Sequence, residues 1–283
     1  MRLHNKLVAA ALAAAMTTAG VGVLAATAPI AASAATAPTA INVTMSSKAI
    51  SLSTTSIPAG NVVFNVKSVK GDHELQLLQL HSGYSKQQAE KDINAAFQGN
   101  KAAVKRVDTN ITWLGGVDAP AGHPGTVAVP LKAGSYFAVD QDSNAVTPFD
   151  VVSATANYRT LYPNAYFTTK GNEFHPHTSL ALPKGGWVKF HNNAEEPHMF
   201  VLQHVKQSTT NKDVQDYIAS GSQQPPSWGL RESAGAAVIS PGQTEVFNYH
   251  LPAGKYLVAC FWPSIQTGQP HFAMGMYKLV ELS

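Results

Sequence analysis

The only cysteine in the chain lies close to one histidine and two methionines near the carboxyl terminus. Cys260 ends an apolar run, and His271, Met274 and Met276 follow after a short, mostly polar segment. A thiolate, an imidazole and a thioether form the soft ligand set that suits copper, provided that a second imidazole arrives from elsewhere. The best supplier is His198, which directly follows Glu-Glu-Pro. These residue types together predict a copper site.

The elements around these residues must bring them to one end of a sheet. Residues 256–259 form a predicted strand that ends at Cys260, and residues 277–280 form the strand that leaves the same loop. His198 opens a third predicted strand, 199–202, so its side chain is expected at a sheet end. A loop-borne site would lie at that end.

Residues 261–270 separate Cys260 from His271 and are rich in turn-forming residues. This segment must make a hairpin excursion if His271 is to return to the site. A second interpretation stays open, in which Cys260 is a small buried hydrophobe, Met274 and Met276 are core methionines, and His271 is a surface imidazole.

The second half of the chain repeats the first. Both halves place a Pro-x-Gly turn at the same distance before a histidine and carry a later Leu-x-Ala-Gly-x-Tyr segment. The matching segments are Pro58 to His73 with Pro183 to His198, and 131–136 with 251–256. A repeat with such a long period indicates duplicated domains and not a solenoid.

Short alternating apolar runs punctuated by Gly, Pro, Asn and Asp predict strands throughout both halves. Helix patterns interrupt them at 86–97 and 210–221. The predicted fold is all-β, with two tandem Greek-key β-sandwiches that each carry a short helical insertion. We term residues 41–153 the first copy and residues 164–283 the second copy, with the boundary expected between 154 and 163.

The two copies differ at the position of the cysteine. Where the second copy has Cys260 between Ala259 and Phe261, the first copy has Asp140 between Val139 and Gln141. The first copy also lacks a later His-x4-Met. Only the second copy therefore carries a full soft ligand set, and the first is expected to be a copper-free partner.

The amino terminus has the pattern of a secretory signal. Arg2 and Lys6 precede an Ala-rich apolar stretch that ends in Ala-Ser-Ala at residues 32–34. We therefore predict a signal peptide over 1–34 and a secreted or otherwise extracytoplasmic protein, with an uncleaved membrane anchor as the alternative. No later segment has the length and hydropathy expected of a membrane span.

Composition excludes several other classes of function. A formal net charge of +3 in 283 residues, with no basic run, gives little support to nucleic-acid binding. A single cysteine cannot form an internal disulfide, so Cys260 needs another role. Hydrolase elbows, phosphate loops and dinucleotide fingerprints do not occur in the sequence.

Pro-His opening a strand, Cys260 ending one, and His-x4-Met with a glycine before the methionine resemble the type 1 copper segments of two-domain cupredoxins. By that resemblance His198, Cys260 and His271 would be equatorial ligands of one copper ion. Met276 would be the axial ligand, with Met274 as a competing candidate.

A type 1 site filled by protein ligands leaves no open position for a substrate. Related oxidases and nitrite reductases carry a histidine directly beside the cysteine, whereas Ala259 and Phe261 flank Cys260. The resemblance thus implies a non-enzymatic electron carrier or copper-holding protein with a redox partner protein. The alternative is a copper-free secreted or cell-surface binding module that uses the same scaffold.

Overall fold

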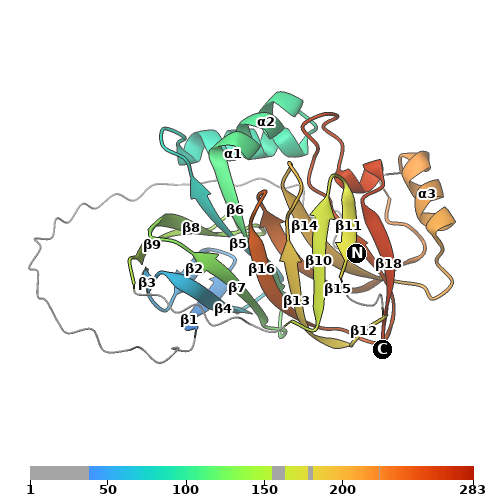
Figure 1. Ribbon diagram of the computed structural model, residues 1–283, viewed down its shortest axis with the longest axis horizontal. Helices are drawn as coiled ribbons and strands as arrows, with labels where there is room; N and C mark the ends of the chain where they lie inside the picture. The colour runs from blue at the N-terminus through green and yellow to red at the C-terminus, as the bar shows by residue number, and fades with distance from the viewer. Residues whose placement is uncertain (1–37, 155–162, 178–180, 223) are drawn as a thin grey trace, which may run out of the picture.

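The computed structural model describes residues 38–154, 163–177, 181–222 and 224–283. The chain is built mostly of strands in two sheets, with short helices at the periphery (Figure 1). The predicted all-β class is therefore confirmed. The predicted signal peptide over 1–34 and most of the predicted boundary between the copies lie outside the described residues.

The first copy contributes nine strands and two helices. They are β1 (Thr39–Ser46), β2 (Ala49–Leu52), β3 (Ser56–Pro58), β4 (Gly60–Ser68), β5 (His73–Leu80), α1 (Lys86–Phe97), α2 (Lys101–Asn110), β6 (Ile111–Ala119), β7 (Gly125–Leu131), β8 (Gly134–Asp140) and β9 (Val146–Val152).

In its described residues, the second copy repeats this order with one α-helix fewer and with a short 3-10 helix before its last strand. Its elements are β10 (Ala165–Lys170), β11 (Glu173–Pro176), β12 (Ala181–Leu182), β13 (Gly185–His191), β14 (His198–Val205), α3 (Asn211–Ser220), β15 (Gly229–Ile239), β16 (Thr244–His250), β17 (Gly254–Ala259), a short 3-10 helix (His271–Met274) and β18 (Tyr277–Leu282).

The two sheets run without interruption through both copies. The order of one sheet is β11-β10-β13-β16-β7-β4-β1-β2, and that of the other is β12-β18-β17-β14-β15-β6-β5-β8-β9-β3. Each half of a sheet mirrors the other half strand for strand. The antiparallel pairs β7–β16 and β6–β15 join the copies, so backbone hydrogen bonds hold the duplicated halves together.

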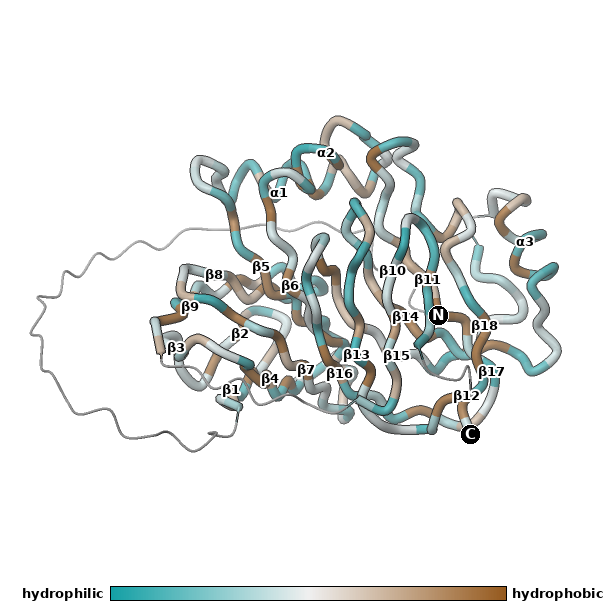
Figure 2. Tube along the Cα trace, in the orientation of Figure 1, coloured by the Kyte–Doolittle hydropathy of each residue, from teal (hydrophilic) through white to brown (hydrophobic). Residues whose placement is uncertain are grey.

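Alternation along the strands places apolar side chains between the sheets. In β4, for example, Val62, Phe64 and Val66 are fully buried while the residues between them are at least partly exposed. Hydrophobic stretches accordingly follow the strands (Figure 2). Each fully buried large apolar side chain contributes about 1.5–3 kcal/mol, so this core is the main source of stability.

Of the three α-helices in the described residues, two match helices predicted from the sequence. The predicted helix at 86–97 is α1, capped by Ser85. The predicted helix at 210–221 is α3, which begins after a capping box between Thr210 and Asp213 and ends at Gly221 in the left-handed conformation. The sequence analysis did not foresee α2. Among the described residues, no helix combines the length and apolar character needed to cross a bilayer.

Candidate metal centre

Three strands position the predicted ligands. β14 pairs with β17, and β17 pairs with β18, so the start of β14, the end of β17 and the start of β18 meet at one end of the sheet. His198 is the first residue of β14, and Cys260 directly follows β17. The side chains of both point into the core and are fully buried.

The segment between Cys260 and His271 is a closed excursion. Pro263 and Pro270 form an isolated bridge, and the N–H of Ser264 donates to the carbonyl of Gln269 at 2.9 Å. At its base, the N–H of His271 donates to the carbonyl of Trp262 at 2.9 Å. These bonds return His271 to the cysteine despite the long spacing in sequence.

The three donor atoms form one compact cluster. The Sγ of Cys260 lies 3.5 Å from the Nδ1 of His198 and 3.5 Å from the Nδ1 of His271. The ligand atoms of all three residues lie within 4.8 Å of one another, and all three side chains are fully buried. No other cluster of at least three such donors occurs in the part of the chain that the structure describes.

The spacing fits a metal ion. Bonds of about 2.0 Å to imidazole nitrogen and about 2.3 Å to thiolate sulfur hold the two atoms about 3.5 Å apart at a tetrahedral angle. The Nε2 of His198 is buried with no hydrogen-bond partner among the described residues. The Nδ1 of the same ring contacts the thiol and is the nitrogen that would bind the ion.

Glu196 holds the other imidazole from behind. Its Oε2 lies 3.0 Å from the Nε2 of His271 and accepts the N–H of Ile265 at 2.9 Å. A carboxylate on the far nitrogen of a metal-binding histidine fixes the tautomer and the ring orientation. This arrangement leaves Nδ1 of His271 directed at the sulfur. Sequence reasoning missed Glu196, although it stands two residues before His198.

The electrostatics favour an ionised thiol. Burial acts to raise the pKa of Cys260, but hydrogen bonds with His198 and His271 lower this pKa to about 6. Burial acts to lower the pKa of His271, but contacts with Cys260 and Glu196 raise it to about 9. These contacts favour a thiolate beside an imidazolium, and a metal ion bound at the Nδ1 of His271 would displace a proton.

The two methionine candidates lie in different surroundings. Met276 is fully buried, its N–H donates to the carbonyl of His271 at 2.9 Å, and its carbonyl accepts from the N–H of Cys260 at 3.3 Å. Met274 is 36% exposed, and its Sδ accepts from the Oγ1 of Thr267 at 3.3 Å. Met276 therefore lies beside the cluster, whereas the sulfur of Met274 is engaged at the surface.

The helices of the first copy cover the excursion. The indole N–H of Trp262 donates to the Oδ1 of Asp108 in α2 at 3.2 Å, and its ring lies 5.5 Å from Phe97 and 5.2 Å from Trp113. The Nζ of Lys101 donates to the carbonyl of Gln266 at 3.2 Å. The first copy thus supports the loop between Cys260 and His271. No local sequence pattern predicts these contacts.

Comparisons with known proteins give distant structural similarity. No protein-family model and no curated protein sequence matches the chain. An auracyanin of Roseiflexus castenholzii aligns with 42% of this chain and 94% of its own, at 16% identity and a TM-score of 0.27. Auracyanin A of Chloroflexus aurantiacus, described as a "blue" copper protein, aligns with 42% of this chain and 96% of its own, with the same identity and TM-score.

A multicopper oxidase of Pediococcus acidilactici covers 87% of this chain and 59% of its own, at 8% identity and a TM-score of 0.22. At these values the similarities assign neither family nor function to this chain. The geometry of the cluster is what bears on function.

Proposed function

We propose that this chain is a type 1 copper protein of the cupredoxin kind that carries single electrons or holds copper. His198, Cys260 and His271 would be the three strong ligands, and Met276 would be the weak axial one. The observation that carries the proposal is the fully buried thiol 3.5 Å from the Nδ1 atoms of two imidazoles.

The donor set favours copper over other metals. Two imidazoles, one thiolate and a distant thioether are the ligands of blue-copper electron-transfer sites. A catalytic zinc site keeps a position open to water, whereas all three donors here are fully buried, as is Met276. When bound, copper would supply a one-electron redox couple.

The protein's own groups would hold the site rigid. Glu196 orients His271, and the N–H of Met199 lies 3.5 Å from the Sγ of Cys260, where it donates to the sulfur. The N–H of Phe272 donates to the carbonyl of Cys260 at 2.7 Å and ties Cys260 to the residue that follows His271. Rigid ligands limit the rearrangement that accompanies electron transfer.

The setting of this activity forms part of the proposal. A signal peptide over 1–34 would deliver the protein outside the cytoplasm, and a redox partner protein would exchange electrons with it. Because all three donors are fully buried, we propose a carrier or holding role and not catalysis by this centre.

The test is visible absorption after copper loading. Copper-loaded wild-type protein is expected to show a strong sulfur-to-copper charge-transfer band with one copper per chain, and Cys260→Ser is expected to lose it. A matched control is Gln266→Ala, which removes an exposed side chain from the same loop without removing a donor. A colourless wild-type protein that retains no copper would contradict the proposal.

A further inference from the structure

A cavity of about 320 Å³ lies beside the candidate metal centre, on the outer face of the ten-stranded sheet. Its walls come from the end of α1, from α3 and the segment after it, from strands β14, β15 and β17, and from the excursion after Cys260. Pockets that bind small molecules typically measure about 300–1,000 Å³. The cavity therefore has room for a small ligand.

Strand alternation separates the cavity from the metal centre by a single residue. Tyr256, Val258 and Cys260 face the core between the sheets, whereas Leu257 and Phe261 face outward, towards α3. Phe272 likewise follows His271 and packs in the same outer cluster. Two residues that line the cavity thus directly follow two candidate ligands.

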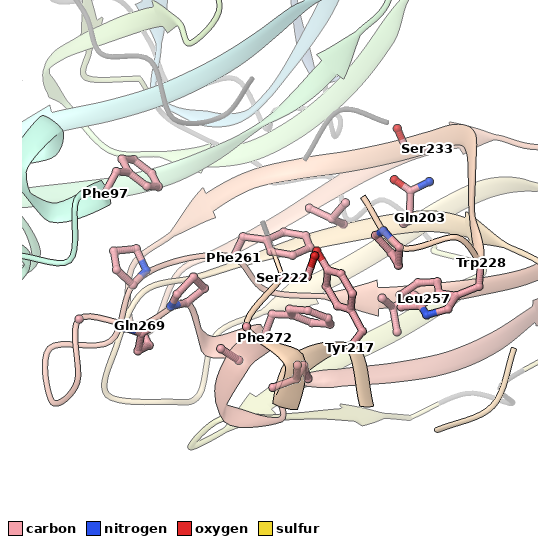
Figure 3. A pocket seen from close by; sticks show the side chains of 18 of the residues that line it. Phe97, Gln203, Tyr217, Ser222, Trp228, Ser233, Leu257, Phe261, Gln269 and Phe272 are labelled. Carbon is pink, nitrogen blue, oxygen red and sulfur yellow. The ribbon is translucent and has the colours of Figure 1, made fainter. Parts of the chain in front are cut away.

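Aromatic rings form much of the wall. Tyr217 meets Trp228 edge-on at a centroid distance of 5.8 Å, and Phe261 lies 5.3 Å from Phe272. Figure 3 shows the rings of Tyr217, Phe261 and Phe272 gathered together, with Phe97 of the first copy across from them. Rings in such arrangements present faces and edges that pack well against another planar ring.

Polar groups are few and lie mainly on the strand floor. Gln203 and Ser233 stand opposite each other on β14 and β15, and Gln203 donates through Nε2 to the carbonyl of Leu230 at 2.6 Å. Asp118 is the only Asp, Glu, Lys, Arg or His among the described lining residues. A wall with one acidic group and no base disfavours an anionic ligand.

We propose that this cavity binds a small, planar, uncharged aromatic molecule. Rings of Tyr217, Trp228, Phe261 and Phe272 supply the apolar contact, and the Ser233 hydroxyl orients the ligand's polar edge. The inference does not depend on copper, because none of the proposed ligands lines the cavity.

The experiment titrates the metal-free full chain with N-phenyl-1-naphthylamine, an uncharged aromatic probe that fluoresces in apolar surroundings. Wild-type protein is expected to give saturable enhancement, with energy transfer from tryptophan. Ser233→Phe fills the cavity from the strand floor and is expected to weaken binding by about tenfold or more. Ser51→Phe adds the same side chain at an exposed position of β2 and is expected to leave binding unchanged.

A second variant covers the case in which Ser233→Phe fails to fold. Ser222→Trp places an indole at the exposed rim of the cavity, on the segment after α3, and is expected to weaken probe binding similarly. Absence of saturable binding to wild-type protein overturns the proposal. Probe binding that is equally tight in a folded cavity-filling variant also overturns it. Neither result bears on copper binding, which is measured separately.

Discussion

The two copies place different side chains at the same strand end, beside a buried histidine. In the first copy the Nδ1 of His73 lies 2.6 Å from the Oδ2 of Asp140, and both side chains are buried. In the second copy the equivalent residues are His198 and Cys260, with 3.5 Å between nitrogen and sulfur. One side chain at the end of a strand therefore separates an ion pair from a candidate metal ligand.

The polar atoms of the His73–Asp140 pair have further hydrogen-bond partners around them. The Nε2 of His73 lies 2.9 Å from the carbonyl of Lys70, and Asp140 accepts the N–H of Asp142 at 3.1 Å. The second copy instead places the Nδ1 atoms of His198 and His271 each 3.5 Å from the sulfur of Cys260. Hydrogen-bonded polar groups are typical of a structural pair, whereas three donors gathered around one point could hold an ion.

The loops account for the remaining difference. Residues 141–145 join β8 directly to β9, whereas residues 260–276 make the excursion between β17 and β18. Only the longer loop can bring a second imidazole and a methionine back to the strand end. The candidate metal site therefore depends on both a thiol at the strand end and a long loop after it.

The largest effects are expected from exchanging Asp140 and Cys260, the residues at the two equivalent strand ends. Cys260→Asp is expected to abolish the sulfur-to-copper charge-transfer band, because a hard carboxylate replaces the soft thiolate. Asp140→Cys is expected to gain no coloured site, because the first copy has no counterpart of His271. Copper content and visible absorption measure both. A blue double variant, Asp140→Cys with Cys260→Asp, would show that the first copy can form a coloured copper site without a counterpart of His271.

Removing the histidine of the first copy tests its structural role. His73→Ala removes the buried imidazole from the Asp140 carboxylate, which keeps its contacts with Asp142 and Ser143, and is expected to cost about 1–3 kcal/mol of unfolding free energy. The copper colour of the folded fraction should remain. His81→Ala, at an exposed histidine, is the control and should change stability by about 0.5 kcal/mol or less. Urea unfolding of both variants supplies the comparison.

Glu196 distinguishes an oriented imidazole from a merely buried one. Glu196→Gln weakens the hold on the Nε2 of His271 and is expected to reduce copper affinity about 10–100-fold. Glu195→Gln changes an exposed neighbour in the same way and should have no comparable effect. Competition with a copper chelator measures both affinities, and equal effects in the two variants would remove the positioning role.

The junction of the copies holds a buried acid whose pKa gives a signed pH dependence. Burial raises the pKa of Glu245 well above its usual value, although the N–H of Gly116 in the first copy donates to its Oε2 at 3.0 Å. The folded protein keeps a proton that the unfolded chain releases above pH 4.5. This group's contribution is therefore present at low pH and lost as pH rises.

Glu245→Gln should remove that dependence, which amounts to at most about 1.4 kcal/mol per pH unit above the unfolded pKa. Unfolding free energies at several pH values between 5 and 7 measure the change in slope. An unchanged slope would show that the acid is not buried at the junction.

The methionines give the smallest effect. Met276→Leu is expected to retain copper but to raise the reduction potential, because loss of a sulfur donor destabilises the more highly charged Cu(II) state. Met274→Leu alters a sulfur that contacts Thr267 at the surface and should leave the potential unchanged. Voltammetry of the two variants decides between them, and a shift in Met274→Leu alone would reverse the assignment.

Local sequence patterns predicted many of the strands and the residues of the candidate site. Period-two runs predicted the strands, and the single cysteine with two histidines predicted which donors meet, because each is fixed to a strand end or an adjoining loop. The long spacing between Cys260 and His271 could be reconciled with one site because its turn-forming residues close on themselves.

Other features depend on contacts between distant segments. Nothing local marks Asp108 as the acceptor for Trp262, or Glu196 as the partner of His271, since the pairing arises only after the sheets assemble. α2 was missed because Asn100 begins a second helix directly after the first one ends. The cavity beside Phe261 likewise exists only where both copies and α3 come together.

The most direct test of the central claim is X-ray absorption at the copper edge of the copper-loaded protein. The geometry of His198, Cys260 and His271 predicts an inner shell of one sulfur and two imidazole nitrogens. A shell of nitrogen and oxygen alone, with no short copper–sulfur bond, would contradict it.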